Sequence, residues 1–300
     1  MPGQTMNTPS HCSMVVASAL GDSVATVCGG RVSVQSLASP GTRVDLDCVA
    51  DASTHLGISE QLDCVFVAEY RRVLTCFDAQ TGARRWTARI PCERLSTTLV
   101  GGDRLLVSPY KGRSVVMDLH DGNVVGRAPS SWSAVGHPRH REWVSVVERR
   151  GNRDLVLRHL DREEVIAAAT DMRGISCCCW NEAGLCLAAP SDPVLRFFDA
   201  RLKELWRFQG PAEHTVMCVS WIDDWFFAQW QNNATGECVV GRGTVASTNC
   251  TTSAAPRMAI CHEVGDCGQA AVGTSGWWNT RSMEWHPRDW GRAGGPTPYP

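Results

Sequence analysis

A repeat of about 40 residues runs through this chain of 300 amino acids and limits its fold more than any other feature. Each unit has two apolar, β-prone runs, then a third that leads into a turn, then a fourth after the turn. The turns begin near residues 37, 78, 118, 158, 199, 239 and 279. One such unit cannot cover both faces of its own sheet, so neighbouring units must pack against each other. The period predicts an all-β fold, a seven-bladed β-propeller of four-stranded antiparallel blades.

The four β-prone runs of each unit are called strands a, b, c and d in chain order. Together they predict a single propeller domain over residues 1–290, followed by an extended tail rich in Gly and Pro over residues 291–300. Two ways of closing the ring stay open. The first and last blades each use only their own strands, or the segment from Thr5 to Pro9 adds a strand to the last blade.

Composition excludes some partners and indicates a compartment. The formal net charge is −2, so no overall excess of charge points to nucleic acid or to a membrane surface. The first residues lack the charged and apolar regions of a signal peptide, and the sequence has no apolar run of 18 residues or more. Many of the 15 cysteines lie in apolar runs, which is typical of buried, reduced thiols. We therefore expect a cytoplasmic protein.

One unit also carries a recognisable motif. The segment from Phe77 to Trp86 reads FDAQTGARRW. It resembles the blade repeat of the quinoprotein-like propellers, and the chain is similar, more weakly, to the WD-repeat propellers. Degraded copies lie at residues 198–206 and 278–285. The resemblance implies a propeller. It also implies an enzyme as an alternative, because quinone-dependent dehydrogenases of this superfamily hold pyrroloquinoline quinone and a divalent cation over the propeller axis. Some of them carry a vicinal cysteine pair against the quinone.

Few groups of residues in the sequence have the types and spacing that such chemistry requires. Cys177, Cys178 and Cys179 form a run inside an apolar strand, where small buried side chains are the simpler interpretation. Cysteines and a histidine between residues 250 and 267 lack the repeated pairing of zinc modules. His137 and His140, with Glu142, lie in a loop before a strand and suit either a metal or a solvated loop. We expect no catalytic residues, no bound cofactor and no metal site.

The repeat also sorts the charges onto two faces of the ring. Loops between strands b and c share one face, and in the first four blades they are rich in cations. We call these residues the basic crescent, which comprises Arg31, Arg71, Arg72, Lys111, Arg113, Arg149, Arg150 and Arg153. The turns between strands a and b lie on the opposite face, and each contains an acid: Asp22, Glu60, Asp103, Glu142, Glu182, Asp223 with Asp224, and Asp266.

These features favour a non-catalytic propeller that serves as a protein–protein interaction scaffold within a multi-protein assembly. The basic crescent is the predicted partner-binding surface, and it suits a protein with an acidic surface. Nucleic acid is disfavoured, because Tyr70 and Tyr110 are the only aromatic residues among these loops. Two alternatives remain: a quinoprotein-like enzyme or small-ligand binder at the central funnel, and a dedicated inhibitor or immunity-type partner of one protein.

Overall fold

The structure is a computed structural model. It describes residues 12–17, 23–28, 30–36, 42–50, 54–69, 72–90, 95–109, 112–129, 134–137, 139–149, 152–162, 164–169, 177–181, 184–188, 193–222, 225–244, 251–255, 269–272, 276–279 and 284–287. Every regular element in these ranges is a β-strand. Within each sheet, neighbouring strands pair antiparallel and follow the order of the chain.

The first three sheets contain four strands each. Sheet 1 comprises β1 (Cys12–Ala17), β2 (Ser23–Cys28), β3 (Arg31–Ser36) and β4 (Arg43–Val49). Sheet 2 comprises β5 (His55–Ser59), β6 (Cys64–Glu69), β7 (Val73–Asp78) and β8 (Arg84–Arg89). Sheet 3 comprises β9 (Leu95–Val100), β10 (Arg104–Pro109), β11 (Ser114–Asp118) and β12 (Val124–Ala128).

The next three sheets repeat this pattern, and a further sheet follows. Sheet 4 comprises β13 (Ala134–Gly136), β14 (Glu142–Arg149), β15 (Asn152–His159) and β16 (Val165–Ala169). Sheet 5 comprises β17 (Cys177–Asn181), β18 (Gly184–Ala188), β19 (Val194–Phe198) and β20 (Glu204–Gln209). Sheet 6 comprises β21 (His214–Ile222), β22 (Trp225–Asn232), β23 (Cys238–Thr244) and β24 (Thr251–Ala255). The last sheet shows three described strands, β25 (Gln269–Val272), β26 (Gly276–Asn279) and β27 (Glu284–Pro287).

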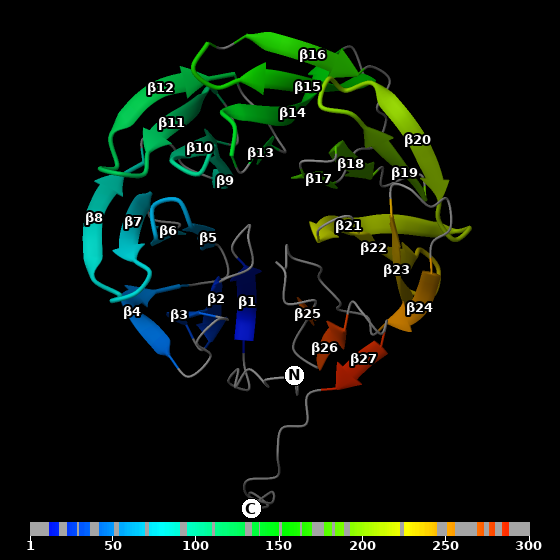
Figure 1. The fold of residues 1–300 in the computed structure, drawn as a ribbon, viewed down its shortest axis with the longest axis horizontal. Coiled ribbons are helices and arrows are strands. Elements are labelled where there is room, and N and C mark those ends of the chain that lie inside the picture. Colours follow the sequence, from blue (N-terminus) through cyan, green and yellow to red (C-terminus); the bar gives the residue numbers. More distant parts are fainter. Residues whose placement is uncertain are drawn as a thin grey trace, which may run out of the picture.

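The sheets stand side by side around a common centre, with the first strand of each four-stranded sheet innermost and the fourth outermost (Figure 1). The inner strands follow one another around the ring, because β1 contacts β5, β5 contacts β9, β9 contacts β13 and β13 contacts β17. The predicted propeller of four-stranded antiparallel blades is therefore confirmed. The inner strand expected for the last sheet, at residues 257–262, lies outside the described residues.

One predicted turn is wrong in position. The turn expected near residue 239 would end strand c of the sixth unit, but β23 continues through that position to Thr244. Sheet 6 contains the longest described strand, β21 with 9 residues, and its β22 spans 8. A fixed period of 40 cannot allow for a unit whose strands lengthen. The turn expected near residue 37 lies outside the described residues.

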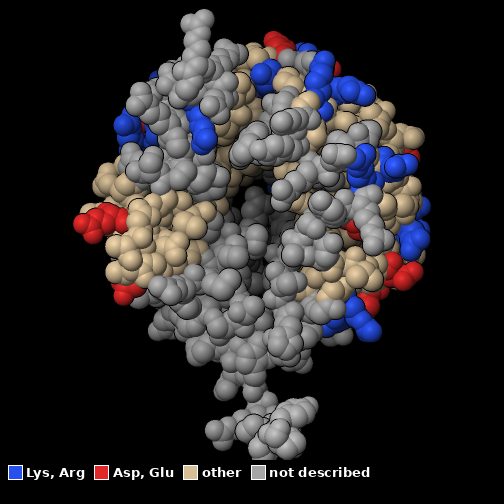
Figure 2. Space-filling view, turned by 180° about the vertical axis from the view of Figure 1, so that it is seen from behind, with Lys and Arg blue, Asp and Glu red and all other residues tan. Residues whose placement is uncertain are grey.

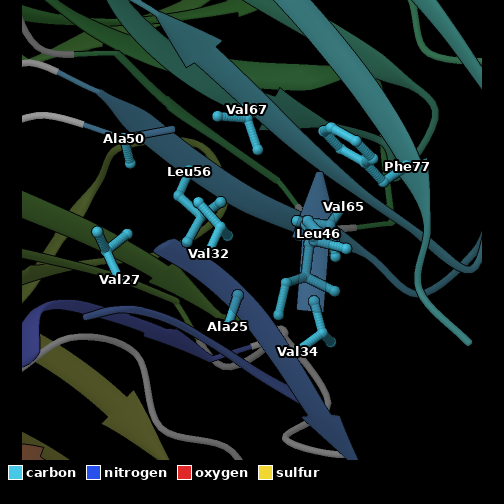
Figure 3. Close-up of a cluster of buried hydrophobic side chains, with 11 residues drawn as sticks. Ala25, Val27, Val32, Val34, Leu46, Ala50, Leu56, Val65, Val67 and Phe77 are labelled. Atoms are coloured by element: carbon cyan, nitrogen blue, oxygen red, sulfur yellow. The ribbon is translucent and has the colours of Figure 1, made fainter. Parts of the chain in front are cut away.

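The hydrophobic core lies between neighbouring sheets rather than inside any one of them. In Figure 3, Val34 and Leu46 of sheet 1 lie toward Val65 and Phe77 of sheet 2, together with other aliphatic side chains of both sheets. Strands b and c are buried on both faces, so β6 and β7 read as almost continuous apolar runs. Each fully buried aliphatic or aromatic side chain contributes about 1.5–3 kcal/mol by leaving water.

The outer strands of sheets 2 to 5 share one irregularity. In each of β8, β12, β16 and β20, pairing with strand c shifts by one residue near the start of the strand. Such a bulge twists an edge strand away from regular pairing, which protects the exposed edge against unwanted strand addition. Trp86 lies just after the bulge in β8, and its indole Nε1–H donates to the carbonyl oxygen of Leu119 in the next sheet at 3.0 Å.

Glycine is required where the c–d turn of one sheet packs on the outer strand of the sheet before it. Gly122 has φ +75°, and a Cβ there would lie 2.6 Å from the ring of Trp86. Gly82, with φ +71°, meets Val44 of sheet 1 in the same way. Both positions therefore need a positive φ and a bare Cα, and both help to set the spacing between sheets.

We predict that Gly122→Ala lowers the free energy of unfolding by about 2–4 kcal/mol, because left-handed strain adds to overpacking against Trp86. Gly112→Ala is the matched control, since Gly112 has φ +98° but no neighbouring atom within 4 Å of the added Cβ. It should cost about 1–2 kcal/mol. Urea denaturation measures both changes, and equal losses would refute the role of inter-sheet packing.

Candidate interaction surface

The turn that carries the quinoprotein-like motif is held by side-chain capping. The carboxylate of Asp78 accepts from the backbone N–H groups of Gln80 and Thr81 and from the Thr81 hydroxyl, at 2.9–3.1 Å. The Arg85 guanidinium donates to Asp78 Oδ2 at 2.7 Å and to the carbonyl oxygen of Asp63 at 2.8 Å. Asp78 and Thr81 thus close the hairpin, as Asx turns do, and Arg85 joins it to the a–b turn at Asp63.

The same turn recurs elsewhere in the ring. In three hairpins the glycine N–H donates to the carbonyl of the residue four positions before it: Gly82 to Asp78, Gly122 to Asp118, and Gly236 to Asn232. The Asn232 side chain accepts from Ala234 N–H and Thr235 N–H at 2.9 Å. This last copy closes a b–c hairpin, whereas the first two close c–d hairpins.

The residues that the structure describes do not fit a quinone site. Cys178 and Cys179 are free thiols, so they form no vicinal disulfide. Cys179 is buried and packs with Val216 and Phe226 of sheet 6, between two blades. In the described ranges, no group of three or more His, Cys, Asp or Glu side chains gathers closely enough to hold a metal ion. The Cys177 side chain and the cysteines between residues 250 and 267 lie outside what is described.

His137 has a structural position rather than an open one. Its side chain is buried, and its Nδ1 accepts from the backbone N–H groups of Arg139 and His140 at 3.1 and 3.0 Å. Its ring lies edge-on to Trp180 of the next sheet, with 5.3 Å between the ring centroids. His137 therefore caps the turn before β14 and helps to join sheets 4 and 5.

The face with the a–b and c–d hairpins, here called the a–b face, carries a chain of ion pairs between sheets 3 and 4. Asp103 lies at its centre, with Oδ2 2.6 Å from Arg141 and 3.1 Å from Arg104. Arg104 also pairs with Asp118 at 2.8 Å, and Arg141 with Asp161 at 3.1 Å. Asp103 does lie in an a–b turn, as expected, but its carboxylate is buried and paired with two arginines of the ring. Asp22, Glu182, Asp223, Asp224 and Asp266 lie outside the described residues.

The opposite face, here called the b–c face, carries the basic crescent. Arg31, Arg72, Arg113 and Arg153 lie at or next to the start of strand c in four consecutive sheets. Arg31 and Arg113 are exposed, and Arg72 and Arg153 are half-buried. The corresponding residues of sheets 5 and 6 are Pro193 and Glu237. The ring places these four arginines on one face. Arg71, Lys111 and Arg150 lie outside the described residues, as does the side chain of Arg149.

Two further arginines belong to this face, and the sequence analysis missed them. Arg89 and Arg127 are exposed at the ends of the outer strands β8 and β12, which reach the b–c face. The sequence signal was a cation at or near the end of strand d, just before the connection to the next sheet. It was overlooked because only the b–c loops were compared.

The two faces differ in how their arginines are neutralised. On the a–b face, Arg85, Arg104 and Arg141 all pair with carboxylates. On the b–c face, no carboxylate pairs with Arg31, Arg89 or Arg127 within the described part of the chain. Figure 2 shows Lys and Arg side chains spread over the upper and right-hand parts of the ring. The b–c face therefore presents cations that are available to a partner.

We predict that Asp103→Asn lowers the free energy of unfolding by about 2–4 kcal/mol, because it leaves cations near the centre of a partly buried network without their shared anion. Asp45→Asn is the control: Asp45 pairs with Arg43 at 3.0 Å, but its side chain is 65% exposed. That change should cost less than about 1 kcal/mol. Chemical denaturation compares the two, and a negligible loss in Asp103→Asn would show that the network does not stabilise the ring.

The capped motif turn should also respond to pH. The Arg85 guanidinium, followed by the N–H and hydroxyl of Thr81, lowers the pKa of Asp78 from 3.8 to about 2. A carboxylate whose pKa is depressed on folding stabilises the protein above its unfolded pKa, and this stability is lost as the pH falls through the folded value. The stability advantage of the wild type over Asp78→Asn should therefore shrink between about pH 4 and pH 2. Thermal unfolding across that window tests this, and a constant difference would contradict it.

Comparison with known proteins adds to this geometry. The family model described as outer membrane protein assembly factor BamB matches residues 25–174, half of the chain. No curated protein matches the sequence. No helix among the described residues is long and apolar enough to span a membrane.

Solved structures show the same fold at low identity. A chain in the crystal structure of a mitotic checkpoint complex is 13% identical, with a TM-score of 0.65 over 91% of this chain and 94% of that one. The β-propeller domain of Cps50 (Swd1) from Myceliophteria thermophila is also 13% identical, with a TM-score of 0.66 over 88% of this chain and 93% of that one. BamB from Moraxella catarrhalis is similar at 13% identity, with a TM-score of 0.45 over 73% of this chain and 84% of that one.

The capped Asp-x-x-Thr-Gly turn, the antiparallel four-stranded blades and the matching family model agree. The chain belongs to the quinoprotein-like propeller family described as outer membrane protein assembly factor BamB.

Proposed function

We propose that this protein is a non-catalytic, seven-bladed propeller that binds protein partners within an assembly, with the basic crescent as its contact surface. The observation that carries the proposal is the placement of Arg31, Arg72, Arg113 and Arg153 at corresponding positions of four consecutive sheets. Sheets 5 and 6 have no cation at that position, so the surface is polarised across the ring. A positive surface of this kind selects and steers partners that carry negative charge.

Known propellers support an interaction role. One structurally similar chain was solved within a mitotic checkpoint complex, and the matching family is described as an assembly factor. In the present chain, the motif that resembles the quinoproteins is occupied in closing hairpins, which gives the enzyme alternative no support. A cytoplasmic location also remains part of the proposal, and the free thiols of Cys48, Cys64, Cys76, Cys178, Cys179 and Cys238 support it.

The order of the sheets along the chain supports the proposed count of seven blades. Six four-stranded sheets and one sheet with three described strands follow in chain order. A fourth strand at residues 257–262 would complete the last blade. The interaction proposal does not depend on how the ring closes, because the crescent belongs to sheets 1 to 4.

We predict that reversing the charge of the crescent releases the partner. The variant is the full chain with Arg31→Glu, Arg72→Glu, Arg113→Glu and Arg153→Glu, purified by affinity tag from its native cells at physiological salt. The wild type should bring down a complex of fixed stoichiometry, and this variant should lose the bound partner by at least about tenfold.

The control reverses four cations at the c–d hairpins of the opposite face: Arg84→Glu, Arg162→Glu, Arg201→Glu and Lys203→Glu. It changes the net charge equally and should keep the partner. Thermal unfolding confirms that both variants fold. Recovery of the wild type as a lone monomer would overturn the scaffold, and equal loss in both variants would overturn the crescent. A single partner of one kind would instead favour the dedicated inhibitor.

A further inference from the structure

The outer strands of the first three sheets end on the b–c face with an unusual set of exposed side chains. Val49 ends β4, Arg89 ends β8, and Arg127 is the residue before the last in β12. All three are exposed, and Val49, at 78%, is the most exposed large hydrophobic side chain in the described ranges. We call these three residues the rim strip. It lies outside the b–c loops that form the basic crescent.

The cations of the rim strip add to those of the crescent instead of being neutralised. The Arg113 guanidinium donates to the carbonyl oxygen of Arg127 at 3.3 Å, so two arginines meet at one corner of sheet 3. In sheet 2, Arg89 pairs with Val73, the residue after Arg72, and Ile90 N–H donates to the carbonyl of Arg72 at 2.7 Å, so Arg72 and Arg89 lie at the same end of neighbouring strands. Arg89 and Arg127 are themselves exposed, and no carboxylate pairs with either within the described part of the chain, so a partner that carries negative charge can reach both.

Val49 adds a different kind of contact to the strip. It pairs with Arg31 across β3 and β4, so an exposed aliphatic side chain lies directly beside an exposed cation of the crescent. An apolar group in this position favours a polypeptide that carries both carboxylates and an apolar side chain. Nucleic acid would call for aromatic stacking partners, and the rim strip has none.

We propose that the rim strip binds an extended acidic segment of a partner protein that also carries an apolar side chain. The segment is extended because its contacts lie at the ends of three successive outer strands around the rim, rather than in one pocket. Carboxylates of the segment meet Arg89 and Arg127, while its apolar side chain covers Val49. This inference rests on the proposed function, because it names the chemistry of the partner and extends the same face outward.

The test uses the full-length protein and a defined probe, a fluorescein-labelled peptide of four Glu-Glu-Leu repeats, followed by fluorescence anisotropy at low and at physiological salt. The double variant Arg89→Glu/Arg127→Glu should raise the Kd at least about tenfold and flatten its salt dependence. Val49→Asp should raise the Kd several-fold, because it adds a negative charge and removes the apolar contact. Arg84→Glu is the matched control, since Arg84 begins the same strand β8 at the opposite face, and it should leave the Kd unchanged.

Results other than these distinguish a failure of the rim-strip proposal from a failure of the proposed function. If the double variant binds like the wild type while the crescent variant loses the peptide, the rim strip is wrong and the proposed function stands. If the wild type does not bind the peptide, the inference is overturned even when a native complex is recovered. A labelled single-stranded DNA of similar length that binds more tightly than the peptide, with no effect of Val49→Asp, would overturn it in favour of nucleic acid.

Discussion

The packing of each sheet against the next is the interaction on which the whole ring depends. Strands b and c have two buried faces, and neither face can be covered from within the same sheet. Val65 and Phe77 of sheet 2 are therefore buried only because sheet 1 lies against them. The second sheet of each such pair still has one apolar face to cover, so a further sheet must pack against it, and an array of blades results.

Polar contacts then fix how neighbouring sheets are set against each other. The indole of Trp86 reaches the carbonyl of Leu119, and the bare Cα of Gly122 lets that ring approach. Between sheets 3 and 4, Asp103 joins Arg104 to Arg141. Through these contacts, charged side chains of the a–b face pair with one another within the protein. On the b–c face, by contrast, Arg31, Arg89 and Arg127 are exposed, and no carboxylate pairs with them within the described part of the chain.

This difference explains why a chain with almost no net charge can still present a charged surface. A carboxylate shared between two guanidiniums in the interior of an interface contributes to stability and little to recognition. An arginine at an exposed strand end contributes little to stability and is available to a ligand. The polarity of the ring therefore arises from which charges are paired, and counting charges by loop does not reveal it.

The sequence was sufficient for the architecture because blade packing imposes a pattern on every unit. Alternation of apolar runs and turns was enough to predict four short antiparallel strands in each unit, as six of the sheets show. It also placed the four described arginines of the crescent on one face, because strand order alone decides which loops share a face. The motif of Asp78 to Gly82 identified a hairpin by its capping chemistry. The same chemistry could not say which hairpin it closes, since its copy at Asn232 closes a b–c hairpin. The fixed period of 40 residues placed the turn near residue 239 inside β23.

Only the tertiary structure decided which charges are paired. Asp103 and Arg141 are 38 residues apart and come together because neighbouring sheets pack, so the neutralisation of Asp103 had no local signal. Arg89 and Arg127 look like ordinary residues of polar outer strands until the ring brings their strand ends beside the crescent. Sequence determines the repeating unit through periodic burial. The contacts between units, which set the electrostatics of the surface, depend on distances in space that no local pattern records.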